Sequence, residues 1–241
     1  MGCCDSHEKL SPGMAKAYRI AGELIRDKLA AEDPEAANAL ADIKESDIVV
    51  VRGQYDHIEQ VLRASGRPFI AISPGALATA ELRADQVMFV NCPGQIDHRG
   101  LLKSEAFVKE GGFLFTTDWA LKHILQQAFP GYVEFNGRAT GDEVIRVEVL
   151  AKEDPLLKTM LGPEDDPQWW LEGSSYPIRV LAPDKVRVLV RSKELGDRYG
   201  EPAVFVSFDY GEGKIYHMIS HYYLQRTETR TLRQRASGEA Y

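Results

Sequence analysis

The stretch GGFLFTTDWALKHIL, residues 111–125, decides the fold of this chain. Residues 113–117 are a short apolar run typical of a buried strand, and residues 119–129 continue with the apolar spacing of a helix. Because so few polar residues separate the two, the strand must pass into the helix through a sharp turn at Thr117 and Asp118. This junction predicts an α/β domain with the turn at one edge of a parallel sheet.

The rest of the chain extends this pattern in two different ways. Before residue 111, strand-like and helix-like runs alternate, which predicts βαβ units and a mainly parallel sheet; the strands are expected at 47–53, 68–73 and 86–94, and the helices at 56–66 and 101–112. After Pro130, strand-like runs follow with few helices between them, at 132–137, 143–151, 176–183 and 186–192, and residues 203–220 read as a hairpin that turns at Gly211–Gly213. The sequence therefore predicts a three-layer α/β/α sandwich with a mainly parallel central sheet, antiparallel strands from the C-terminal half, and an N-terminal helical extension.

Three regions are expected along the chain. Residues 1–45 are predicted to be a tail followed by helices at 12–31 and 34–43, residues 46–225 to be the α/β domain, and residues 226–241 to be a second tail. The helix at 12–31 has an apolar stripe that would pack on the domain or on a second subunit, so a homodimer is left open.

Composition excludes several classes of protein. The 241 residues are 44% hydrophobic with a net charge of −7, which argues against a nucleic-acid partner. The three cysteines suggest no disulfide framework, and with no secretory signal the expected compartment is the cytoplasm. The N-terminal residues MGCCDS match a lipidation pattern, with myristate on Gly2 and palmitate on Cys3 and Cys4. Membrane association is expected only if these residues are acylated; the alternative is an unmodified terminus.

The candidate site lies in the loops that follow the predicted strands. In an open parallel sheet, ligands bind beyond the carboxyl ends of the strands. Asp118 and His221 are the candidate catalytic residues, and the other residues expected to line the pocket are Gln54, Tyr55, Cys92, Gly94, Thr117 and Trp119.

Several of these residues have a structural alternative to a functional role. Asp118 is interpreted as a cap of the following helix, as a general base or a carboxylate that orients a ligand, or as both. Cys92 is interpreted as a buried, unreactive thiol rather than a displaced nucleophile. His217 and His221 are four residues apart on a predicted strand, where their side chains stand well apart, so no metal site is predicted. No nucleotide-binding glycine motif is present and no cofactor is predicted.

Three segments resemble the class I glutamine amidotransferase-like superfamily, which has a flavodoxin-like fold. VMFVNCPG (87–94) resembles the strand and glycine loop that supply the oxyanion hole, GGFLFTTDWALKHIL resembles the strand, elbow and helix that carry the nucleophile, and GEGKIYHMISHYY (211–223) resembles the hairpin that ends in the catalytic histidine. Within the superfamily, the chain is most similar to the branch without amidotransferase activity that includes trehalose-utilisation-like proteins. The resemblance puts Asp118 where the family has its nucleophilic cysteine and His221 where it has its histidine. The family's acid after the histidine has no counterpart, because Tyr222 and Tyr223 follow.

These features lead to three functional hypotheses. The first is a catalytically silent amidotransferase-like domain that binds a small molecule or a protein partner. The second is a hydrolase that uses Asp118 and His221 as an acid–base pair. The third is a lipid-anchored scaffold that depends on the N-terminal MGCC. Glutamine hydrolysis is not expected, because a thiol-based amidase needs its cysteine at the elbow; whether another enzymatic activity is present is left open.

Overall fold

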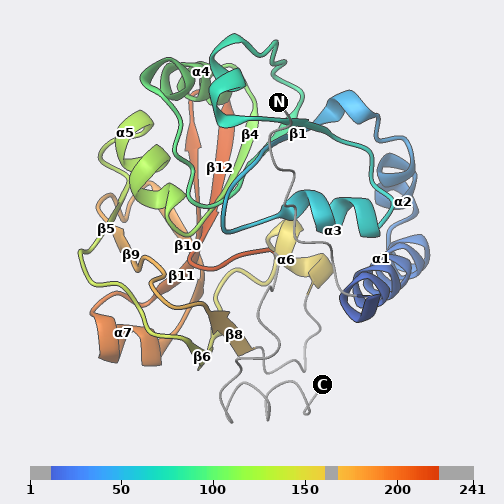
Figure 1. Ribbon diagram of the computed structural model, residues 1–241. Coiled ribbons are helices and arrows are strands. Elements are labelled where there is room, and N and C mark those ends of the chain that lie inside the picture. The colour runs from blue at the N-terminus through green and yellow to red at the C-terminus, as the bar shows by residue number, and fades with distance from the viewer. Residues whose placement is uncertain (1–11, 161–167, 223–241) are drawn as a thin grey trace.

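A computed structural model of the chain describes residues 12–160 and 168–222, and its architecture is the predicted sandwich of helices around a central sheet (Figure 1). The chain begins with α1 (Pro12–Glu32) and α2 (Pro34–Ala41), which confirms the two expected N-terminal helices. Within the described residues no helix combines the length and the apolar character that a membrane crossing requires. The lipidation candidates Gly2, Cys3 and Cys4, and the expected tail at 226–241, lie outside the described residues.

The parallel half of the sheet is built by strands that the sequence predicted. Its neighbouring strands run in the order β2-β1-β3-β4-β12, and each of these pairs is parallel. Their bounds are β1 (Ile48–Val51), β2 (Ile70–Ile72), β3 (Val87–Val90), β4 (Phe113–Thr117) and β12 (Gly213–Met218). Because β12 comes from the end of the described chain yet pairs with β4, it brings the residues after Met218 beside the turn at Asp118.

The antiparallel half continues the same sheet from β12 through β11, β10 and β7. These strands are β11 (Ala203–Tyr210), β10 (Val186–Arg191) and β7 (Glu148–Val149). A further strand, β9 (Ile178–Val180), pairs with β11 and with β5 (Val133–Phe135). The predicted hairpin at 203–220 is therefore confirmed as β11 and β12. A separate two-stranded sheet pairs β6 (Glu143–Arg146) with β8 (Gln168–Leu171), a strand that the sequence did not predict.

Side chains alternate between the two faces of the sheet, and each face has its own core. On β1, Val49 and Val51 belong to the large core with residues of α4 (His98–Lys109), whereas Ile48 and Val50 pack with Ile58 of α3 (Ile58–Ala64). In Figure 1, α3 and α1 lie on one side of the sheet, and α4 and α5 (Gln126–Ala128) lie on the other. The remaining helices are α6 (Pro155–Met160), α7 (Lys193–Tyr199) and short 3₁₀ turns at Glu45–Asp47 and Pro74–Thr79.

Two local predictions differ from the structure. The expected helix at 119–129 instead begins as a π-helical segment, Leu121–Leu125, and only its last turn is α5. In α3, the N-cap is His57 rather than Asp56, and it makes no side-chain cap hydrogen bond. Asp56 and Glu59 have the sequence spacing of a capping box, but the Asp56 carboxylate instead accepts a hydrogen bond from the Thr117 hydroxyl, far away in the sequence.

Candidate functional site

The turn after β4 has the backbone of a strained elbow. Asp118 has φ = 44°, a left-handed conformation that is uncommon for a residue other than glycine. Its N–H donates to Met218 O at 2.9 Å, and its carbonyl accepts from Leu121 N at 3.0 Å, so the elbow is tied both to β12 and to the helix that follows. Such strained residues cluster at functional sites, where the surrounding structure holds them in place.

The Asp118 carboxylate points away from the helix that it precedes and toward the second half of the chain. Oδ1 accepts the Tyr176 N–H at 2.8 Å, and Ser175 Oγ lies 3.5 Å from Oδ2. The interpretation as a helix cap is therefore wrong, since the side chain binds a distant backbone group instead of the first N–H groups of the helix. Burial raises the pKa of this carboxyl group above its ordinary value, although the contacts with His221 and Tyr176 act in the opposite direction.

His221 lies between two carboxylates. Its Nδ1 is 2.9 Å from Glu172 Oε2, and its Nε2 is 3.3 Å from Asp118 Oδ2. Burial opposes the charged imidazolium, but the contacts with Asp118, Cys92 and Glu172 outweigh it and raise the pKa of His221 well above its ordinary value.

Glu172 is a member of this cluster that sequence reasoning missed. It follows β8 and reaches His221 from outside the parallel half of the sheet, so the structure supplies an acid partner that the residues after His221 do not. The available signal was weak: a single glutamate between Trp169–Trp170 and Ser174–Ser175.

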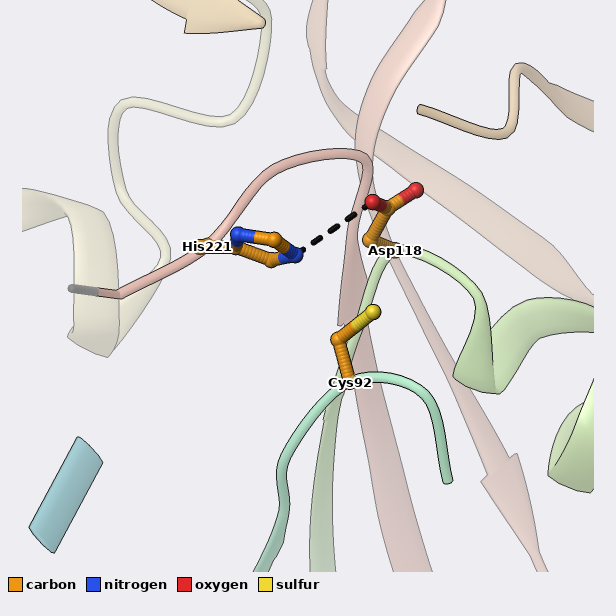
Figure 2. Close-up of side chains that lie close together, drawn as sticks. All are labelled: Cys92, Asp118 and His221. Carbon is orange, nitrogen blue, oxygen red and sulfur yellow. Dashed lines mark ion pairs between the residues drawn. The ribbon is translucent and has the colours of Figure 1, made fainter. Parts of the chain in front are cut away.

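Cys92 completes the cluster from the loop after β3. Its Sγ, the Asp118 carboxylate and a ring nitrogen of His221 lie within 4.8 Å of one another. Figure 2 shows the three side chains pointing toward one another. The peptide bond to Pro93 is cis, and the Cys92 carbonyl accepts from Gln54 N at 2.9 Å and from Tyr55 N at 3.0 Å. Burial raises the pKa of the thiol, and His221 offsets only part of that effect. The thiol is thus buried, as expected, and it faces the other two candidate residues.

The Asp56 carboxylate links the loops of this cluster through hydrogen bonds. The sequence did not predict Asp56 as a site residue. The side chain is fully buried, and Oδ2 accepts the Thr117 hydroxyl at 2.9 Å and the Tyr222 N–H at 3.1 Å. The Thr117 hydroxyl in turn accepts the Cys92 N–H at 3.2 Å. Thr117, expected to line the pocket, is instead a buried link between the three loops.

The remaining predicted pocket residues lie around this cluster. Gln54 and Tyr55 are exposed, and Tyr55 meets the ring of Trp119 edge-on at 5.1 Å between centroids. Trp119 stacks on Tyr176 at 5.4 Å and donates through Nε1 to Ser174 O at 2.7 Å. These three aromatic side chains form a rim beside the Asp118 elbow.

Gly94 and His217 have structural roles. Gly94 has φ = 69°, and a Cβ there would stand 2.8 Å from Ala120 Cβ, so glycine allows the loop to pack on the helix start. The Gly94 N–H donates to Asn91 O rather than toward a ligand. His217 is fully buried on β12 with Nδ1 2.8 Å from Thr116 Oγ1, and it takes no part in the cluster around His221.

Comparison with known proteins supports the fold and leaves the family undecided. No family model and no curated protein matches the chain. Among solved structures, the chain is similar to the cytoplasmic protein STM1381 of Salmonella typhimurium LT2, with a TM-score of 0.52, 12% identity, and coverage of 74% of this chain and 89% of that one. It is also similar to the cytoplasmic protein STM3548 of Salmonella typhimurium, with a TM-score of 0.51, 13% identity, and coverage of 73% and 87%.

Two further solved structures are similar with TM-scores below 0.5. A putative ThuA-like protein from Bacteroides uniformis matches with a TM-score of 0.49 at 12% identity, over 72% of this chain and 80% of that one. The GH42 β-galactosidase Gan42B matches with a TM-score of 0.49 at 12% identity over 76% of this chain, which spans only 28% of that enzyme. At these identities the likenesses concern the fold alone. The neighbours therefore support the α/β fold and assign the chain to no family.

Proposed function

We propose that this chain is a small-molecule-binding domain on an amidotransferase-like fold and that it does not hydrolyse glutamine. The observation that carries the proposal is the elbow residue: Asp118 holds the strained position of a nucleophile, but its carboxylate already accepts the Tyr176 N–H and pairs with His221. A thiol at this position would be needed for the family's covalent step, and Cys92 stands in a different loop, before a cis proline.

The site nevertheless keeps features that a purely structural edge of a sheet does not need. Burying three ionisable groups together costs free energy, so their retention favours a functional role. The rim of Tyr55, Trp119 and Tyr176 places aromatic side chains beside the buried polar cluster, a combination typical of small-molecule sites. A protein partner or a second copy of the chain is the remaining alternative for this edge.

Thermal unfolding of the full chain tests this proposal. Amino acids, sugars and polyols would be added singly, and a compound at about 100 times its Kd is expected to add about 2.7 kcal/mol to the free energy of unfolding. Trp119→Leu and Asp118→Asn should lose the shift, whereas His98→Gln, at an exposed residue on α4, should keep it. Release of glutamate from L-glutamine by the wild type, lost in Asp118→Asn or Cys92→Ser, would contradict the proposal.

A second candidate function is a hydrolase, and the contact between Glu172 and His221 favours it. Glu172, His221 and Asp118 form a continuous carboxylate–imidazole–carboxylate row at the strained elbow. In such an enzyme Asp118→Asn is expected to reduce hydrolysis of p-nitrophenyl esters or glycosides by 100-fold or more, by analogy with the roughly 10²–10⁴-fold contribution of acid–base groups. Equal rates for the wild type and Asp118→Asn would count against the hydrolase and in favour of binding alone.

A further inference from the structure

We propose that Cys92, Asp118 and His221 bind one zinc ion, with Glu172 as the partner that orients His221. This inference rests on the proposed function, since it names a ligand for the same site. It follows from the position of the three side chains, from the buried nitrogen of His221, and from the chemistry of the three ligand atoms.

The side chains are close enough to share an ion. Their ligand atoms lie within 4.8 Å of one another, and His221 Nε2 is 3.3 Å from Asp118 Oδ2. In a tetrahedral zinc site with ordinary bond lengths, neighbouring ligand atoms stand roughly 3.3–3.6 Å apart. Small side-chain rotations, of roughly 1 Å at the ligand atoms, would therefore complete three corners of a tetrahedron. Among the described residues this is the one group of at least three histidine, cysteine and acidic side chains with such spacing.

His221 presents the nitrogen that a metal needs. Its side chain is only 5% exposed, and its buried Nε2 faces Asp118 Oδ2 at 3.3 Å, at the side of the ring where Cys92 also lies. Its other nitrogen, Nδ1, is held by Glu172. Metal-binding histidines characteristically direct one nitrogen at the ion and the other at a carboxylate or carbonyl, which fixes the ring.

The mixture of ligand atoms selects zinc over other common divalent ions. Magnesium and calcium prefer oxygen ligands alone, whereas zinc accepts sulfur, nitrogen and oxygen together. The thiolate of Cys92 and the carboxylate of Asp118 would neutralise the two charges of the ion within a buried site. Three protein ligands leave the fourth position of zinc free for water or for an atom of a bound small molecule.

Titration of the full chain with Co²⁺, as a spectroscopic substitute for zinc, tests the site. The background is a full-length chain with Cys3→Ser and Cys4→Ser, so that Cys92 is its sole cysteine. We expect one equivalent of Co²⁺ to bind with the visible bands of a tetrahedral ion and a near-ultraviolet thiolate band, and Zn²⁺ to displace it.

The variants separate the roles of the residues. Cys92→Ser should remove the thiolate band, and Cys92→Ala should do the same if the first variant is poorly folded. Asp118→Asn and His221→Gln should lose tight binding. Glu172→Gln should weaken binding about 10- to 100-fold, as is usual for a partner of a metal-binding histidine. His98→Gln, outside the cluster, should bind as the background does. A background protein that binds Co²⁺ without a thiolate band, or that leaves Co²⁺ octahedral, would overturn the zinc site.

The two proposals can fail separately. The titration contains no small molecule, so it decides the zinc site without reference to the proposed ligand. If a compound stabilises chelator-treated protein while Co²⁺ is not bound, the zinc site is wrong and the binding domain stands. If Co²⁺ binds through Cys92 while the wild type releases glutamate from L-glutamine, the zinc site stands and the proposed function is wrong.

Discussion

At the scale of single residues, the site is held by buried polar groups whose partners come from distant loops. Asp56 is the strongest case, because one carboxylate accepts both the Thr117 hydroxyl and the Tyr222 N–H and so fixes the elbow relative to the segment that carries His221. A buried carboxylate of this kind stabilises the fold only while it and its donors are all hydrogen-bonded, since leaving one buried donor without an acceptor costs about 1–3 kcal/mol of stability.

His217 leads to a pH prediction at this scale. Burial lowers its pKa to about 3 from an ordinary value of 6.5. Between pH 6.5 and 3, His217 is therefore protonated in the unfolded chain and neutral in the folded chain. Its contribution to the free energy of unfolding is complete above pH 6.5 and falls as the pH decreases toward 3. We expect a slope of about 1.4 kcal/mol per pH unit from this residue.

Urea unfolding between pH 4.5 and 7.5 measures this slope. His217→Gln should unfold with a shallower pH dependence than the wild type, by about one proton, and His98→Gln should match the wild type. If the free energy of unfolding of His217→Gln and of the wild type changed with pH by the same slope, the buried imidazole would not govern stability in acid.

At the scale of elements, the loops after β1 and β3 interlock through their backbones. Gly53 lies where a Cβ would stand 2.2 Å from the Cys92 carbonyl oxygen, which itself accepts the Gln54 and Tyr55 N–H groups. A side chain at residue 53 would therefore push the Cys92 loop away from the β1 loop and displace the thiol from the site.

Gly53→Ala is accordingly expected to destabilise the fold by roughly 2 kcal/mol or more, in the range of other overpacked sites. Gly75→Ala is the matched control, because a Cβ there meets nothing within 4 Å, and its effect should stay within about 0.5 kcal/mol. Chemical denaturation of the two variants checks this prediction, and equal losses of stability would refute the interlocking of the loops.

At the scale of the whole molecule, the order of the strands joins the two halves of the chain. The parallel strands come mostly from the first half, yet their last member, β12, is also the partner of antiparallel β11, so a single sheet of ten described strands carries both halves. The large core likewise contains residues from Val49 to Ile219.

This shared sheet predicts cooperative unfolding of the domain. Far-ultraviolet circular dichroism reports the whole sheet, and tryptophan fluorescence reports the Trp119 elbow and the Trp169–Trp170 strand. The two signals are expected to change at the same urea concentration. Two separated transitions would instead show that the antiparallel half folds independently.

The sequence by itself determined the fold class and part of the site. Apolar periodicity and glycine positions were enough to predict the strand before Asp118, the hairpin that ends near His221 and the parallel sheet, because these signals are local. The rule that ligands bind at the carboxyl edge then placed Cys92, Asp118 and His221 in one region.

Only the tertiary structure decided how these residues are paired. Asp56 looked like a helix cap and Asp118 like another, since either role is the ordinary local use of an aspartate before a helix. Burial at the meeting point of three loops gave both carboxylates distant partners instead. Glu172 was missed for the same physical reason: its contact with His221 depends on the path of a separate small sheet, and no local pattern of residues encodes that path.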